Sequence, residues 1–147
     1  MDYIECPSTY SPELFRRSIF LAGGITNCPN WQQEMVRLLS ATNYTLLNPR
    51  RKNFPIDDPN AGREQIVWAY HALRDANAIL FWFPCETLCP IVLYELGAWS
   101  MTNKPLYVGV HPKYERRKDV EIQTELVRPD VRVVFSLERL AEQVQKH

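Results

Sequence analysis

The sequence predicts an α/β fold in which helices cover both faces of a mostly parallel sheet. Short apolar runs recur along the chain, and the strongest, at residues 78–83, reads Ala-Ile-Leu-Phe-Trp-Phe. A run that is apolar without alternation is typical of a strand covered on both faces. Segments with helical spacing of apolar residues separate these runs, and such alternation of strand and helix is the pattern of βαβ units.

Five strands are expected, at residues 18–22, 44–47, 78–83, 106–110 and 131–134. The first is followed by the tight turn Gly23-Gly24, and prolines follow the second and third. Residues 1–17, which are polar and contain proline, are expected to form a lead-in. The 147 residues are thus predicted to be a single domain, a three-layer sandwich with five strands in a flavodoxin-like or Rossmann-like order.

Five helices are expected between and after these strands, at residues 31–40, 63–74, 90–101, 120–126 and 137–145. Asn30 is placed to cap the first helix, and Pro90 to open the third. The polar segment 50–62 is predicted to be a loop, long enough to suggest a functional one.

The charge balance argues against two classes of partner. The chain has 17 Lys plus Arg and 17 Asp plus Glu, so its formal net charge is zero and a nucleic-acid polymer is not expected as a partner. No apolar run approaches the roughly 20 residues that cross a bilayer, and the acidic N-terminus does not resemble a signal peptide. We expect a soluble cytoplasmic protein that does not act at a membrane.

Four cysteines stand at positions 6, 28, 85 and 89. The spacing of Cys85 and Cys89 suits a zinc site, but the nearest histidines, His71 and His111, are single and distant in sequence. We therefore prefer reduced, mostly packed thiols to a metal site or a disulfide framework.

Ligands of parallel α/β sheets bind outside the carboxyl ends of the strands, so the loops after the strands are the segments to search. The turn at Gly23, Gly24 and Ile25 lets a ligand approach backbone amides closely, although a plain tight turn explains it equally well. It lacks the GxGxxG pattern of a dinucleotide site. Asn48 and Arg50, at the start of a basic run, offer phosphate contacts or simply a solvated surface.

Aromatic residues end the third predicted strand. Trp82 and Phe83 have flat faces on which a planar base can stack, and the alternative is that both belong to the core.

Glu95 is the only charged residue between Thr87 and Asn103. On a helix its neighbours at i±3 and i±4 are all apolar, so its carboxylate lies on a face that should be buried. Burying an unpaired carboxylate costs several kcal/mol, which points either to chemistry or to a partner such as a buried arginine. A dry carboxylate can be a nucleophile at an anomeric carbon, a general base or a metal ligand. Glu86 is a candidate to protonate a leaving group, unless it is an exposed loop residue.

Four segments together resemble one known family. They are residues 19–25 (Ile-Phe-Leu-Ala-Gly-Gly-Ile), residues 47–50 (Leu-Asn-Pro-Arg), residues 79–84 with Glu86-Thr87, and residues 94–97 (Tyr-Glu-Leu-Gly). They resemble nucleoside 2-deoxyribosyltransferase-like proteins over about residues 18–138.

The resemblance implies a flavodoxin-like fold and cleavage of the N-glycosidic bond of a nucleoside or its 5′-monophosphate, without metal or cofactor. It implies that Glu95 attacks the sugar C1′ and forms a glycosyl ester, which a second base or water then cleaves. It places Gly23, Gly24 and Ile25 near the sugar, and includes Thr87 in a substrate-binding motif. Because family members pair subunits so that a neighbour closes each site, it also implies a homodimer or a larger homo-oligomer.

The chain departs from the better-known members at two positions. Ala69 and Cys89 stand where those members carry aspartates that help to recognise and protonate the base. This departure motivates an alternative, a non-catalytic nucleotide-binding module that senses or sequesters its ligand.

Overall fold

Three neighbouring strands that are buried at every position form the centre of the structure. The computed structural model describes all 147 residues. Its parallel sheet contains β1 (Asp2–Glu5), β2 (Ser18–Gly23), β3 (Thr45–Asn48), β4 (Ala78–Phe83) and β5 (Leu106–Val110), in the order β1-β3-β2-β4-β5. The prediction that β4 is covered on both faces is confirmed, and β2 is likewise buried at every position.

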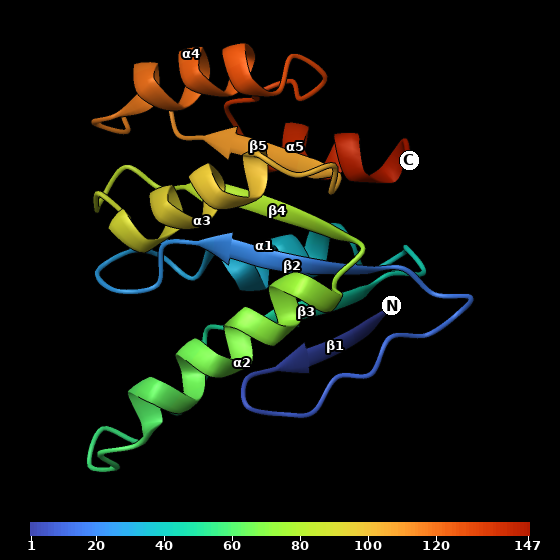
Figure 1. The fold of residues 1–147 in the computed structure, drawn as a ribbon, viewed down its shortest axis with the longest axis vertical. Coiled ribbons are helices and arrows are strands. Elements are labelled where there is room, and N and C mark those ends of the chain that lie inside the picture. The colour runs from blue at the N-terminus through green and yellow to red at the C-terminus, as the bar shows by residue number, and fades with distance from the viewer.

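Side chains that alternate along these strands divide the core into two layers. Phe20, Ile79 and Phe81 face one layer, whereas Ile19 and Leu80 face the other. The five helices are α1 (Trp31–Leu38), α2 (Ala61–Asp75), α3 (Pro90–Ser100), α4 (Arg117–Val127) and α5 (Leu137–Gln145). Core residues of α2, α3 and α4 share the first layer, and those of α1 and α5 share the second. Figure 1 shows α2 and α3 crossing in front of the sheet with α1 behind it, which confirms the predicted three-layer α/β sandwich.

The chain reverses its direction across the sheet at β2. From β2 it moves outward to β3 through α1, and then crosses back over β2 to β4 through α2. The loops that leave β2 and β4 therefore turn to opposite faces of the sheet. The carboxyl ends of these two strands frame the crevice where such sheets bind ligands.

Two expectations about the sheet are wrong. The predicted lead-in contains a strand, because residues 2–5 pair with β3 from Asp2 opposite Thr45 to Glu5 opposite Asn48. This strand lies at the edge and is largely exposed, so its side chains carry no burial pattern, and only the backbone pairing reveals it.

The predicted strand at residues 131–134 is reduced to an isolated bridge between Gly109 and Val134. Its two hydrogen bonds join Val134 to the backbone of Val108 and Val110. Ser136 then caps α5, so only a short stretch of chain remains beside β5. The five predicted helices are confirmed, with ends that move by up to three residues.

Candidate active site

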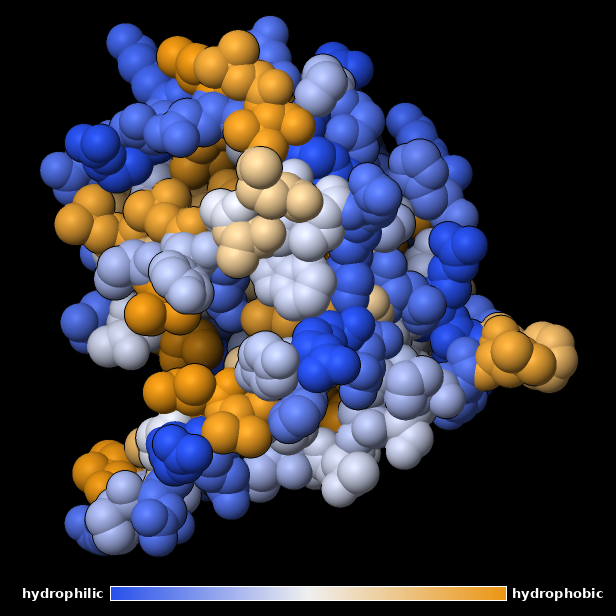
Figure 2. All heavy atoms as spheres, in the orientation of Figure 1, coloured by the Kyte–Doolittle hydropathy of each residue, from blue (hydrophilic) through white to orange (hydrophobic).

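A cavity of about 880 Å³ opens between α2, α3 and the loops that follow β2 and β4. Its walls are mostly apolar, and Figure 2 shows the molecule hollowed on its left side, with hydrophobic residues gathered along the hollow. Glu95 is the only charged side chain among the residues that line it. A second hollow, of about 510 Å³, lies near Phe15 and Gln145 and has no acidic residue in its lining.

Glu95 is held on α3, which Pro90 opens as predicted. Val92 and Leu96 anchor this helix in the core, and Glu95 lies beside them, half-buried and facing the cavity. The structure gives its carboxylate no hydrogen bond and no ion pair, so the alternative of a buried arginine partner finds no support. Burial raises the pKa of Glu95 to about 7 and is the only cause of the shift. The carboxyl group therefore changes its charge near neutral pH.

The turn after β2 needs glycines because neighbouring atoms approach its backbone closely. Unusual backbone angles are not the reason, since no glycine has a positive φ. A Cβ on Gly23 would lie 2.2 Å from Trp31 Cζ2, and one on Gly24 would lie 2.8 to 3.0 Å from three heavy atoms of neighbouring side chains. Any side chain here would displace the residues that pack against the turn. Gly23, Gly24 and Ile25 all line it, as does Thr87 from the loop after β4.

The carbonyl of Gly24 is fixed by two donors from α1. Trp31 Nε1 donates to it at 2.9 Å and Gln32 Nε2 at 3.0 Å, and both side chains are buried. The N–H of Ile25 belongs to the same trans peptide unit, so it points away from α1, and no acceptor in the protein takes it. Because Ile25 also lines the cavity, the turn brings a free backbone donor to a residue of the cavity wall.

Arg50 supports the loop after β2, Asn48 contacts Arg50, and neither residue lines the cavity. The Arg50 guanidinium donates to the backbone carbonyls of Cys28 and Pro29 and to Gln32 Oε1, at 2.8 to 3.1 Å. Asn48 is buried and accepts a hydrogen bond from the backbone N–H of Arg50. The cation proposed for phosphate binding is therefore occupied with holding the loop after β2.

The structure places the other predicted residues away from Glu95. Glu86 is exposed, accepts a hydrogen bond from the Cys85 thiol and does not line the cavity. Trp82 and Phe83 are buried in opposite core layers, so the alternative that both belong to the core is the one observed. Their aromatic faces are covered by protein.

Several lining residues were not predicted, among them Gln65, Tyr70, Tyr94 and Trp99. The contributions of α2, at positions 65, 66, 69, 70 and 73, form one helical stripe. This stripe is visible in the sequence, but nothing there says that it faces a cavity rather than the core.

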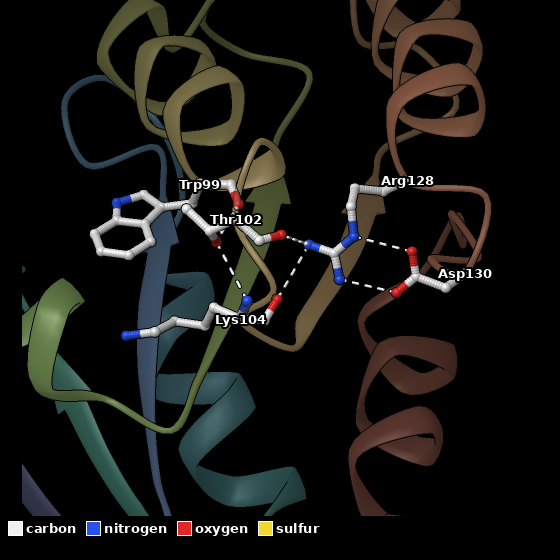
Figure 3. Close-up of polar contacts among 5 residues, drawn as sticks. All are labelled: Trp99, Thr102, Lys104, Arg128 and Asp130. Atoms are coloured by element: carbon white, nitrogen blue, oxygen red, sulfur yellow. Dashed lines mark hydrogen bonds and ion pairs between the residues drawn. The ribbon is translucent and has the colours of Figure 1, made fainter.

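Polar contacts surround the end of α3, where Trp99 and Thr102 line the cavity (Figure 3). Thr102 donates to the carbonyl of Trp99 at 2.7 Å, and Arg128 donates to the carbonyls of Thr102 and Lys104 while it pairs with Asp130. The ammonium of Lys104 binds two carbonyls at the end of α2. These contacts fasten the segment after α3 to the end of α2.

The four cysteines are free thiols, two of them buried. Cys89 lines the cavity, and burial raises its pKa to about 12, so its sulfur is protonated at neutral pH. No group of three or more His, Cys, Asp or Glu residues is arranged to hold a metal ion.

One comparison with known proteins identifies a family. The family model described as nucleoside 2-deoxyribosyltransferase-like matches residues 16–114, a span that includes the glycine turn and Glu95. A search of curated proteins finds no significant match. No helix of the structure is long and apolar enough to span a bilayer. Since the family model covers more than half of the chain, the protein belongs to the nucleoside 2-deoxyribosyltransferase-like family.

Proposed function

We propose that this protein cleaves or transfers the N-glycosidic bond of a nucleoside, with Glu95 as the nucleophile. The observation that carries the proposal is the position of Glu95, a carboxylate without a partner in an otherwise uncharged cavity at the carboxyl edge of a parallel sheet. Poor solvation makes the ionised form reactive, and the structure offers no cation that would quench it.

The reaction proceeds in two displacements at C1′. The Glu95 carboxylate attacks C1′, a C–O bond forms, and the C1′–N bond breaks with its electron pair going to the base, which takes up a proton. Water or a second base then attacks C1′ and displaces the carboxylate. Each step inverts the configuration, so the product retains it. In this proposal the free N–H of Ile25 binds a sugar oxygen.

An unphosphorylated nucleoside suits the cavity better than a 5′-monophosphate. No lysine or arginine lines it, and Arg50 is committed to the loop after β2. A phosphate dianion in this apolar space would lack a counter-charge and would be repelled by ionised Glu95.

A homo-oligomer belongs to the same proposal. Ile66 and Tyr70 on α2, and Ile91 and Tyr94 on α3, line the cavity and are more than half exposed. Apolar rims of this kind mark surfaces that another molecule covers, and a second copy placed there would close the cavity. Sedimentation of wild type and of Tyr94→Glu tests this, because only the wild type should form the larger species.

The alternative function is nucleotide binding without cleavage. It is favoured by the absence of a second acid in the cavity, since Glu86 lies outside it and Cys89 is a protonated thiol.

One experiment separates the two functions. The protein is incubated with 2′-deoxynucleosides, ribonucleosides and their 5′-monophosphates, and free base is measured by chromatography. Release of base by wild type but not by Glu95→Gln, together with a sugar ester on Glu95 in the mass spectrum of quenched enzyme, supports catalysis. Ligands that raise the melting temperature yet are recovered intact support the binding module. If Glu95→Gln released base as fast as wild type, the assignment of Glu95 as the nucleophile would be refuted.

A further inference from the structure

One buried polar atom in the protein has no hydrogen-bond partner. It is Oε1 of Gln65, and it is the only buried side-chain nitrogen or oxygen atom in this condition. Buried polar groups almost always find a partner, because an unpartnered one loses its bonds to water and gains nothing in return. An isolated exception calls for a function.

The surroundings explain why Gln65 finds no partner within the chain. It lies in the first half of α2 and lines the cavity with Ile66, Ala69 and Leu73, none of which carries a side-chain donor. Its neighbour Glu64 is engaged with Arg51 at 3.0 Å and offers no donor either. Gln65 belongs to the cavity wall, and its covered oxygen has no partner to give up when the carboxamide turns toward a guest.

We propose that Gln65 reads the base of the substrate, its carboxamide oxygen accepting an N–H from the edge of the base while its amide nitrogen donates to the adjacent acceptor. This inference rests on the proposed function and specifies its substrate class, a nucleoside whose base presents a donor beside an acceptor on one edge. A planar primary amide suits such an edge because its oxygen accepts from the donor of the base and its nitrogen donates to the acceptor.

The layout of the cavity favours the base rather than the sugar as the partner of Gln65. In the proposed reaction C1′ lies at Glu95 on α3 and the sugar faces the glycine turn after β2, so the base is left to extend toward α2. The wall there is apolar and includes Tyr70 and Ile66, which suits the flat faces of a base, while Gln65 meets its polar edge. Because the carboxamide does not titrate, Gln65 selects the base without protonating it.

The test compares wild type with Gln65→Leu, which removes the amide at similar size. A matched control is Gln33→Leu, on the exposed surface of α1. Each protein is assayed with the best nucleoside substrate, with its analogue in which the N–H of the base edge is methylated, and with a 2-deoxyriboside whose aryl leaving group has no N–H. Binding of free adenine, cytosine, guanine, thymine and uracil is measured by calorimetry, and melting temperatures are recorded.

We expect Gln65→Leu to lose about thirtyfold in kcat/KM on the nucleoside, the value of its two hydrogen bonds to the base. On the aryl substrate, which offers the base edge neither bond, the variant should keep its full activity. Discrimination against the methylated analogue should vanish, and free-base affinity should fall similarly. Its melting temperature should not fall, because the variant removes an unpartnered buried oxygen. A lower melting temperature, or an equal loss on the aryl substrate, would mean a structural role and overturn the inference.

The two proposals fail in different ways. If wild type cleaves no substrate, glycosidic cleavage is refuted, whereas loss of free-base binding in Gln65→Leu would still support Gln65 as the base reader. If wild type is active and Gln65→Leu keeps its discrimination and its free-base affinity, only the inference about Gln65 is refuted. If wild type neither cleaves a nucleoside nor binds any free base, both proposals are refuted.

Discussion

Replacement of Glu95 by glutamine should stabilise the protein at alkaline pH. Glutamine has nearly the same shape as glutamate but stays neutral, so Glu95→Gln removes the cost of a poorly solvated charge without leaving a cavity. The raised pKa of Glu95, about 7 against an ordinary 4.5, measures that cost. At 1.36 kcal/mol per unit of pKa, the ionised carboxylate destabilises the native state by about 3 kcal/mol.

The sign of the pH dependence follows from proton uptake. Between about pH 4.5 and pH 7 the native protein holds a proton on Glu95 that the unfolded chain has lost, so the free energy of unfolding falls as the pH rises through this window. Above it the full penalty is present, and below it the penalty is absent. The stability advantage of Glu95→Gln over wild type should therefore be about 3 kcal/mol larger at pH 9 than at pH 4.

Urea unfolding followed by circular dichroism, at equal protomer concentration, measures this advantage across the pH range. Glu125→Gln is the matched control, because Glu125 is an exposed residue of α4 outside the cavity, where the same substitution removes no buried charge. An advantage of Glu95→Gln that does not change with pH would refute the reasoning, since it would mean that the carboxylate is solvated or neutralised by a cation.

Three further predictions follow from the site. Because attack requires ionised Glu95, kcat/KM should rise with pH up to about 7 and then level off, and a fall across this range would instead make Glu95 an acid. Gly24→Ala should lower the free energy of unfolding by about 1–3 kcal/mol, because the new methyl group would lie 2.8 to 3.0 Å from three heavy atoms. In the control Gly62→Ala the methyl group meets nothing within 4 Å, so this variant should not be destabilised. Equal melting curves for the two variants would contradict this. Gln32→Leu removes a donor to the Gly24 carbonyl, so it should lower the free energy of unfolding in urea by about 1–3 kcal/mol and also lower kcat/KM. Unchanged kcat and KM would show that the turn does not need this support.

The elements that bury apolar surface were predictable from local pattern. Residues 78–83 form a fully buried strand, as a continuous apolar run predicts, and Pro90 opens α3 as its fixed φ predicts. The edge strand at residues 2–5 was not predictable in this way, because its stability comes from backbone pairing with β3 rather than from burial of its own side chains.

Glu95 was also predictable, because a single charge in an apolar helical stretch conflicts with burial and so attracts attention in the sequence alone. Arg50 shows the limit of such reasoning. Its charge and its place after a strand suggested a phosphate contact, yet its guanidinium is used up by carbonyls of the loop after β2. Whether a cation is free or engaged depends on acceptors more than fifteen residues away in the chain.

The amino-acid sequence by itself determined the α/β class, the helices and the one carboxylate out of place, since periodicity and burial are properties of neighbouring residues. Tertiary structure alone decided which side chains share the cavity with Glu95. Gln65 joins it because α2 crosses back over β2 to reach β4, a path that no local pattern encodes. Trp82 is excluded because its side of the strand packs against the layer of α1 and α5.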